Sequence, residues 1–105
     1  MLGVDAPDRP DGGLLQVLAD PLRWQILRLL ATEQLCTCHL VELTGAGQTN
    51  ISNHLRVLRD AGIVRPEPHG RFTYYLLVGE TLTALAGQLG ALAAAAEGLR
   101  RRPCP

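Results

Sequence analysis

Residues 44–64 constrain the fold most, because they combine a tight turn with a strongly amphipathic helical period. Apolar side chains fall at Ile51, Leu55 and Leu58, spaced by four and then three residues, which places them on one face of a helix. The Thr-Gly-Ala-Gly segment at 44–47 predicts a turn that separates this helix from a shorter amphipathic helix before it. Together these segments predict a helix-turn-helix.

The opposite face of the second helix carries short amides, hydroxyls and arginines. Amides and hydroxyls are indifferent helix formers, and all three groups can reach base edges and phosphates in the DNA major groove. We therefore interpret this face as a DNA-reading surface; the alternative is the solvated face of a structural helix. The predicted DNA contacts on this helix are Gln48, Thr49, Asn50, Ser52, Asn53, His54 and Arg56.

Two segments typical of strands, 63–68 and 71–77, flank a turn at 69–70. Two prolines mark the first segment as an exposed edge strand. A hairpin behind a recognition helix is a wing. Arg71, next to the turn, is a further candidate contact with phosphate or the minor groove, unless the turn is simply solvated.

The remaining patterns predict a mainly α (α+β) chain: a winged helix-turn-helix with about five helices plus a two-stranded β-hairpin wing. A Pro/Gly-rich, acidic leader at 1–12 is expected to be disordered, and a tail at 100–105 to be flexible. Residues 13–99 would then form one DNA-binding and dimerisation domain.

The helices of this domain differ in how clearly the sequence marks them. Asp20 followed by Pro21 predicts a helix start with an N-cap acceptor and proline at the first helical position. Trp24 is interpreted as a packing residue. The side chains expected to face the core in this helix and the next are Leu22, Ile26, Leu29, Leu30, Leu40 and Leu43.

The last helix is expected over 81–100 and carries leucine or alanine at alternating spacings of three and four residues, which is typical of a coiled-coil seam. A narrow apolar seam on a small domain favours a two-fold homodimer over a helix that only covers its own domain. A dimer would also present two recognition helices about 34 Å apart on one face of DNA.

Composition limits the partners and the cellular compartment that we expect for the protein. The 105 residues carry no net charge, but residues 21–75 hold six arginines against four acidic side chains, so this part permits DNA binding. The N-terminus does not resemble a secretory signal, and no apolar run is long enough for a membrane span. We expect a cytoplasmic protein without a membrane partner, in which three cysteines favour thiol or metal chemistry over a structural disulfide.

Cys36 and Cys38 lie two residues apart near the start of the first helix of the motif. If Cys36 is the N-cap, its sulfur turns back and both sulfurs can converge on one thiophilic ion, while the helix N-terminus favours both thiolates. Arsenic(III) or antimony(III) prefers three sulfurs, so Cys104 or an exogenous thiol would complete the set. His39 would instead suit Zn(II) or Cd(II). The alternatives are a dithiol redox switch and two ordinary small residues.

Three segments resemble the ArsR/SmtB winged-helix repressors: residues 18–23 (Leu-Ala-Asp-Pro-Leu-Arg), residues 48–64, and residues 70–75 (Gly-Arg-Phe-Thr-Tyr-Tyr). Residues 33–40 are similar to the arsenic-sensing subgroup's Glu-Leu-Cys-Val-Cys-Asp-Leu-Cys signature. Two thiols of that signature carry over to Cys36 and Cys38. The third falls on Val41 and the aspartate on His39, and the last helix lacks the Asp and His ligands of the zinc-sensing subgroup.

The resemblance implies a homodimeric repressor, not an enzyme, that controls a resistance operon and leaves its operator DNA when the inducer binds. Arsenite or antimonite is the implied inducer, and Cd(II) or Zn(II) the alternative. Cys36, Cys38 and Cys104 are the candidate ligands. Two other classes stay open: a redox-responsive repressor, and a winged-helix module that binds protein. A nucleophile triad of Cys36, His39 and Glu42 is disfavoured, because helical spacing alone provides no oxyanion site.

Overall fold

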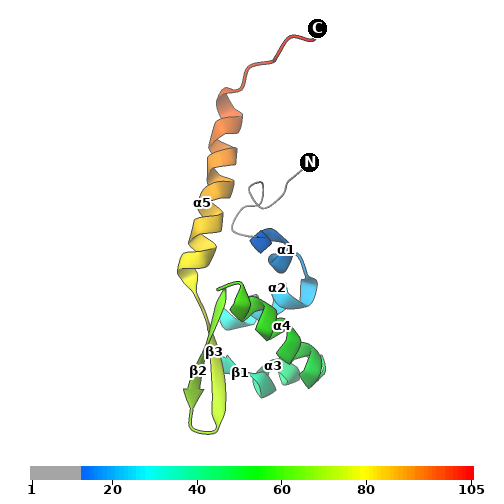
Figure 1. Ribbon diagram of the computed structural model, residues 1–105, viewed down its shortest axis with the longest axis vertical. Helices are drawn as coiled ribbons and strands as arrows, with labels where there is room; N and C mark the ends of the chain where they lie inside the picture. Colours follow the sequence, from blue (N-terminus) through cyan, green and yellow to red (C-terminus); the bar gives the residue numbers. More distant parts are fainter. Residues whose placement is uncertain (1–12) are drawn as a thin grey trace.

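The structure is a computed structural model that describes residues 13–105, so the predicted leader at 1–12 lies outside the described residues. Residues 13–105 form five α-helices and a small sheet, arranged as Figure 1 shows, which confirms the predicted winged helix-turn-helix fold. The elements are α1 (Leu14–Leu18), α2 (Pro21–Leu30), β1 (Leu35–Cys36), α3 (Thr37–Thr44), α4 (Gln48–Asp60), β2 (Val64–His69), β3 (Phe72–Leu77), α5 (Gly79–Ala95) and a 3₁₀ turn, η4 (Ala96–Gly98).

The start of α2 is built as the sequence predicts. The Asp20 carboxylate accepts hydrogen bonds from the backbone N–H groups of Leu22 at 2.9 Å and Arg23 at 3.0 Å, and Pro21 occupies the first turn. The hydrogen bond from Arg23 is the main reason that the pKa of the Asp20 carboxyl lies below its usual value. An ionised carboxylate at the N-cap stabilises α2, because the N-terminus of a helix is the positive end of its dipole.

The core lies between α2, α3, α4 and the base of the sheet. Its most completely buried side chains are Ile26, Leu40, Ile51, Leu55, Leu58 and Ile63. Two sequence expectations are wrong here: Leu43 is 51% exposed because α3 turns it away from the core, and Trp24 is 52% exposed on α2. Leu27, which was not assigned to the stripe of α2, is buried, whereas Leu22 and Leu29 are only half-buried.

The sheet has three antiparallel strands in the order β1-β3-β2, one more strand than the predicted hairpin. β2 and β3 form the wing, and Gly70 supplies the left-handed backbone (φ 62°) that its turn requires. β2 is an edge strand, as its prolines predict. The added strand β1 pairs Leu35 with Tyr75 and Cys36 with Tyr74, and so joins the start of α3 to the wing.

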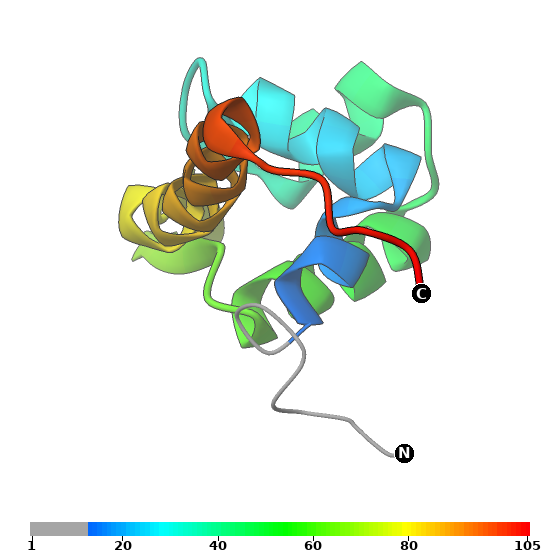
Figure 2. The same cartoon turned by 90° about the horizontal axis from the view of Figure 1, so that it is seen from above.

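Helix α5 rises away from the other helices, and the tail continues beyond it (Figures 1 and 2). It begins two residues before the predicted start and ends at Ala95 instead of near residue 100. On α5, Leu85 is the one buried leucine of the predicted seam, whereas Leu89 and Leu92 are 50% and 70% exposed. Leu99, the last predicted seam position, lies past the helix in extended backbone and is 75% exposed. Within residues 13–105, no helix combines the length and hydropathy needed to cross a bilayer.

Candidate functional site

Helix α4 presents the predicted polar face to solvent. Ile51, Leu55 and Leu58 are at most 1% exposed and hold the helix against the core and α3. Gly45 ends α3 with a left-handed backbone (φ 77°), which allows the tight turn into α4. The exposed side chains on the opposite side are the predicted Gln48, Thr49, Asn50, Ser52, Asn53 and Arg56.

His54 differs from the other predicted contacts on α4, because it is half-buried. Its Nδ1 lies 3.1 Å from Nη1 of Arg23 in α2. A guanidinium can only donate, so Nδ1 of His54 is the acceptor and its proton is on Nε2 when the ring is neutral. The ring therefore has a hydrogen-bond partner inside the fold.

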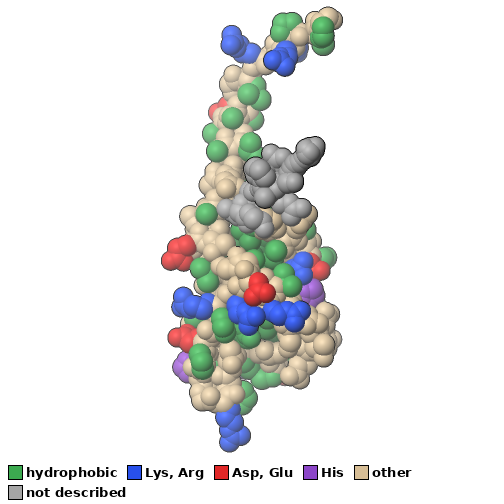
Figure 3. Space-filling view, in the orientation of Figure 1, with side chains coloured by type: hydrophobic (Ala, Val, Ile, Leu, Met, Phe, Trp, Pro, Cys, Tyr) green, Lys and Arg blue, Asp and Glu red, His purple; other side chains and the backbone are tan. Residues whose placement is uncertain are grey.

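Arg71, the predicted contact on the wing, is exposed beside the turn. Figure 3 shows one basic side chain at the tip of the wing and a band of basic side chains across the middle of the same face. Arg59, at the end of α4, forms an exposed ion pair of 3.4 Å with Asp60. Exposed arginines lie on α4 (Arg56 and Arg59) and on the wing (Arg65 and Arg71), and also on α2 and in the tail.

The junction of β1 and α3 brings two sulfurs together. Cys36 is the N-cap of α3, with extended backbone (φ −90°, ψ 171°), and Cys38 is the second helical residue. Their Sγ atoms lie 2.7 Å apart, longer than a disulfide bond of about 2.05 Å. Cys36 is 4% exposed, whereas Cys38 is exposed. The predicted convergence of the two side chains is confirmed.

The two thiols differ in acidity. Burial alone would raise the pKa of Cys36, but hydrogen bonds from the Cys38 thiol and from backbone N–H groups at the start of α3 outweigh it, so the pKa of Cys36 is lowered. The hydrogen bond with Cys36 raises the pKa of Cys38. The expectation that the helix start favours both thiolates is therefore wrong for Cys38, whose pKa is raised.

His39 lies beside Cys36 but already has partners. Its Nδ1 accepts a hydrogen bond from the backbone N–H of Cys36 at 3.1 Å and lies 3.3 Å from Cys36 Sγ. The ring also contacts Tyr74 of β3, with 5.9 Å between ring centroids. Here His39 closes the first turn of α3, and a metal at Nδ1 would have to replace that hydrogen bond.

Within the described part of one chain, no third ligand joins the two sulfurs. Among residues 13–105, no three Cys, His, Asp or Glu side chains are arranged to hold a metal ion. Cys104 is exposed in the tail, beyond the end of α5 that lies farthest from β1 and α3 (Figure 1). Its predicted ligand role within the same chain therefore finds no support, and a partner's tail is the remaining route.

The sulfur pair opens into a cavity of about 340 Å³ between α3, the first residue of α4 and the wing. Sequence reasoning did not connect the cysteines with the wing, because the connection depends on the pairing of β1 with β3. The cavity is lined by Cys36, Thr37, Cys38, Gln48, Arg71, Phe72, Thr73 and Tyr75.

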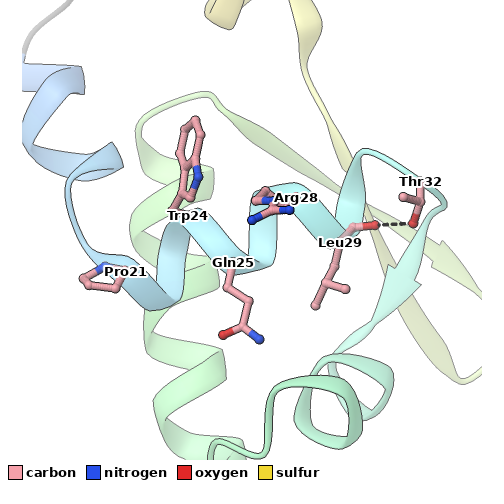
Figure 4. A pocket seen from close by; sticks show the side chains of 6 residues that line it. All are labelled: Pro21, Trp24, Gln25, Arg28, Leu29 and Thr32. Carbon is pink, nitrogen blue, oxygen red and sulfur yellow. Dashed lines mark hydrogen bonds between the residues drawn. The ribbon is translucent and has the colours of Figure 1, made fainter.

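A second hollow, of about 510 Å³, lies on the outer face of α2 (Figure 4). The Trp24 ring stands out from the helix, and Arg28 is the only charged side chain among the lining residues shown. At the far end, Thr32 Oγ1 donates to the carbonyl of Leu29 at 2.7 Å. None of these residues lines the thiol cavity.

Comparisons with known proteins agree with this geometry. Residues 20–65 match the model of the bacterial regulatory proteins of the arsR family. The arsenical resistance operon repressor of Bacillus subtilis is 32% identical over 74 residues, which cover 70% of each chain. Such relatives are longer than the matched segment, which spans 46% to 76% of their length.

Solved structures give the same result. A possible transcriptional regulator for arsenical resistance superimposes with a TM-score of 0.68 at 32% identity, covering 82% of this chain and 96% of that one. The homodimeric winged helix-turn-helix domain Mb0332 of Mycobacterium bovis has a TM-score of 0.63 at 26% identity, covering 85% and 84%. These relatives are regulators, not enzymes. With its fold and these matches, the chain belongs to the ArsR family of bacterial transcriptional regulators.

Proposed function

We propose that the protein is a homodimeric repressor that leaves its operator DNA when arsenite or antimonite binds Cys36 and Cys38. The observation that carries the proposal is the convergence of two sulfurs, 2.7 Å apart, in a cavity lined by the start of α4 and by the wing. The ligand site thus lies against both elements that would hold DNA.

Operator binding is supported by the surface of α4 and the wing. The exposed amides and hydroxyls of α4 suit base edges and phosphates, and Arg56 and Arg71 are exposed cations on α4 and on the wing. We propose Gln48, Thr49, Asn50, Ser52 and Asn53 as groove contacts, with His54 held partly inside the fold by Arg23.

A homodimer is supported by α5. Two leucines of its seam, Leu89 and Leu92, are at least half exposed in the single chain. A second copy can cover this seam and set two recognition helices on one face of DNA. The relative from Mycobacterium bovis is named as homodimeric.

Coupling between ligand and DNA follows from the position of Cys36. This residue ends β1, where it pairs with Tyr74 of the wing, and caps α3, which packs on α4. Binding both sulfurs to one atom would fix the Sγ atoms relative to each other at this junction, and a movement of Cys36 would be passed to the wing and to α4. A coupling of about 1–3 kcal/mol would lower operator affinity roughly 5–150-fold.

The third ligand for arsenite has three possible sources. His39 is adjacent but engaged in capping α3, so it would serve Cd(II) or Zn(II) only after that hydrogen bond is lost. Cys104 can reach the pair only from a partner's tail, and an exogenous thiol needs no rearrangement of the chain.

The test is a titration of the reduced protein on a fluorescent fragment of its own promoter. Arsenite should lower the anisotropy of the fragment bound to wild type. Cys36→Ser and Cys38→Ser should bind the fragment and stay bound when arsenite is added. Arsenate is the matched chemical control, because it does not form As–S bonds by direct replacement of its oxygens with thiols. Release of DNA from either serine variant by arsenite would show that the sensor lies elsewhere.

A second candidate function is favoured by the closeness of the sulfurs. A peroxide could oxidise Cys36 and Cys38 to a disulfide and be reduced to water, and the strained short loop would move the start of α3. Reversal by dithiothreitol separates this switch from arsenite binding, since the peroxide-treated protein would regain operator affinity without removal of any metalloid.

A further inference from the structure

Arg23 of α2 contacts two neighbouring helices at once. Its Nε donates a hydrogen bond to the carbonyl of Val17 in α1 at 2.7 Å, and its Nη1 lies 3.1 Å from Nδ1 of His54 in α4. The backbone N–H of Arg23 is fixed as well, because it donates to the Asp20 carboxylate at 3.0 Å. With the backbone and Nε both engaged, the planar guanidinium is held in an orientation that directs Nη1 at His54.

This contact selects one protonation state of His54. A guanidinium stays protonated throughout the pH range of a folded protein and can only donate, so Nδ1 of His54 has to offer a lone pair. Histidine gains its proton between about pH 8 and pH 5. A proton on Nδ1 would turn the acceptor into a donor and place a second cation against Arg23. The hydrogen bond between α2 and α4 therefore forms only with the neutral ring that carries its proton on Nε2.

The Asp20 carboxylate is the other charged group of α2 that acts on His54. The hydrogen bond from the Arg23 backbone is the main reason that the pKa of this carboxyl is lowered, and a charge on His54 adds to the effect. Asp20 would therefore attract a protonated ring. However, it already accepts two backbone hydrogen bonds, whereas Arg23 contacts the ring directly, so the repulsion from Arg23 dominates.

The other elements around α4 add no ion pair to His54. Helix α1 carries no charged residue, and on α4 itself Arg56 is exposed and Arg59 is paired with Asp60. Helix α3 and strand β2 also pack on α4. Within residues 13–105, no ion pair joins His54 to their titratable side chains, which are Cys38, His39, Glu42, Arg65, Glu67 and His69.

From these contacts we infer that His54 is a positioning residue for α4 and not a contact with DNA: its neutral ring holds the helix against α2 through Arg23, and protonation of the ring weakens operator binding. The inference rests on the proposed function for its effect on DNA, but not for the contact between the two side chains.

The position of α4 matters because exposed amides stand next to His54. Asn53 precedes it in the chain, and Asn50 lies about one helical turn before it; both are proposed groove contacts. Hydrogen bonds to base edges depend on distance and angle, so a small movement of α4 costs base contacts more than phosphate contacts. Acid should therefore reduce affinity for the operator more than affinity for unrelated DNA.

The two possible roles of His54 predict opposite effects of acid. If the ring contacted a phosphate, protonation would add a positive charge at the DNA surface and strengthen binding. If the ring positions α4, protonation breaks the hydrogen bond from Arg23 and weakens binding. The sign of the pH dependence separates the two roles.

The experiment measures the operator affinity of the reduced full chain by anisotropy of the promoter fragment from pH 7.5 to pH 5.5, without arsenic and at constant ionic strength. Wild type should lose about tenfold in affinity or more, because a hydrogen bond to a charged group is worth about that factor in an equilibrium constant. Circular dichroism at each pH checks that the helices are retained.

Asparagine and glutamine form a matched pair of variants at this position. The amide oxygen of asparagine takes the place of Nδ1, whereas that of glutamine lies one atom farther out, at the place of Nε2. His54→Asn should bind the operator within about threefold of wild type at pH 7.5 and lose the pH dependence, since an amide does not titrate in this range. His54→Gln should bind about tenfold more weakly at pH 7.5, because it does not restore the hydrogen bond with Arg23.

His69→Asn is the matched control for the titration. His69 is an exposed histidine on the wing, the other element proposed to hold DNA, and its ring contacts Tyr74. This variant should keep the pH dependence of wild type.

Nitrogen-15 NMR of the histidine rings tests the contact without DNA. The signals of His54 are those missing from the spectrum of His54→Asn. At pH 7.5 they should show a proton on Nε2 and none on Nδ1.

The outcomes distinguish the two proposals. The inference is overturned by operator affinity that is unchanged or rises toward pH 5.5, by a pH dependence that persists in His54→Asn or is lost in His69→Asn, or by a proton on Nδ1 at pH 7.5. Tighter binding by His54→Gln than by His54→Asn would assign the ring to DNA through Nε2 and overturn it as well. Wild type that does not select its promoter at pH 7.5 overturns the proposed function, and a proton on Nε2 then leaves the contact between Arg23 and His54 standing.

Discussion

Arg23 in α2 donates a hydrogen bond from Nη1 to Nδ1 of His54 in α4, across 3.1 Å. The same guanidinium donates from Nε to the carbonyl of Val17 in α1, at 2.7 Å. One half-buried side chain thus joins three helices, and one of them is the proposed DNA-reading helix. The angle of α4 to the rest of the fold depends on this arrangement as well as on its buried leucines.

We predict that Arg23→Ala lowers both stability and operator affinity. Two hydrogen bonds from a charged, half-buried donor are lost, which costs about 1–3 kcal/mol of the free energy of unfolding. Urea unfolding and promoter anisotropy measure the two effects. Arg23→Lys is the matched control, because lysine keeps the charge but not the fork that reaches both partners. Full operator affinity in Arg23→Ala would contradict a positioning role.

A second prediction concerns Asp20 and pH. Asp20→Ala removes the cap of α2 and should lower the Tm by roughly 4–8 °C. The pKa of this carboxyl is lowered in the folded chain, so its stabilisation is present above the unfolded value of about 3.9 and is lost as pH falls through the folded pKa. The difference in Tm between wild type and Asp20→Ala should therefore shrink in acid. A difference in Tm that stays constant down to pH 2 would show that the charge of Asp20 does not contribute to stability.

The third prediction tests the unequal thiols. In a Cys104→Ser background, thiolate absorbance should show one group titrating below the ordinary cysteine pKa and one above it. Cys38→Ala removes the thiol donor and should raise the pKa of Cys36, since burial then acts with less opposition. Cys36→Ala should instead lower the pKa of Cys38. Two superimposed titrations in the parent protein would contradict the shared hydrogen bond.

Much of the fold was predictable because its signals are local. The spacing of Ile51, Leu55 and Leu58, the Asp20 cap and the turn at Gly70 each need only a few neighbouring residues. The N-cap position of Cys36 entered the sequence argument only as a condition, since two side chains two residues apart inside a helix cannot meet, and the structure meets that condition.

The remaining features depend on contacts between distant segments. A strand of two residues, β1, is too short to show a period, so its pairing with β3 and the thiol cavity beside Phe72 could not be predicted. Exposure of Trp24 and Leu43 depends on how α2 and α3 are rotated in the fold. The raised pKa of Cys38 depends on its contact with Cys36, which is present only once the start of α3 has formed.

The fourth prediction concerns α5. Leu92→Glu places a charge on a seam position that is 70% exposed in the single chain, so the monomer should stay folded while the dimer dissociates. Light scattering should give the monomer mass, and operator affinity should fall. Thr83→Glu is the matched control, because it adds the same charge to the same helix off the seam. A dimeric Leu92→Glu protein would place the interface elsewhere.

The last prediction separates phosphate contacts from base contacts. Arg56 on α4 and Arg71 on the wing are exposed, and each contact with a phosphate releases condensed counterions. Arg56→Ala or Arg71→Ala should reduce the slope of log affinity against log salt by about 1 per chain, and should weaken operator and unrelated DNA alike. Arg28→Ala is the matched control, because this arginine lies on the outer face of α2 with Trp24 (Figure 4).

Asn50→Ala and Asn53→Ala should instead keep the salt slope and lose discrimination between operator and unrelated sequence, since an amide carries no charge to release counterions. An unchanged slope in Arg71→Ala would remove the wing from the DNA interface while leaving α4 in it.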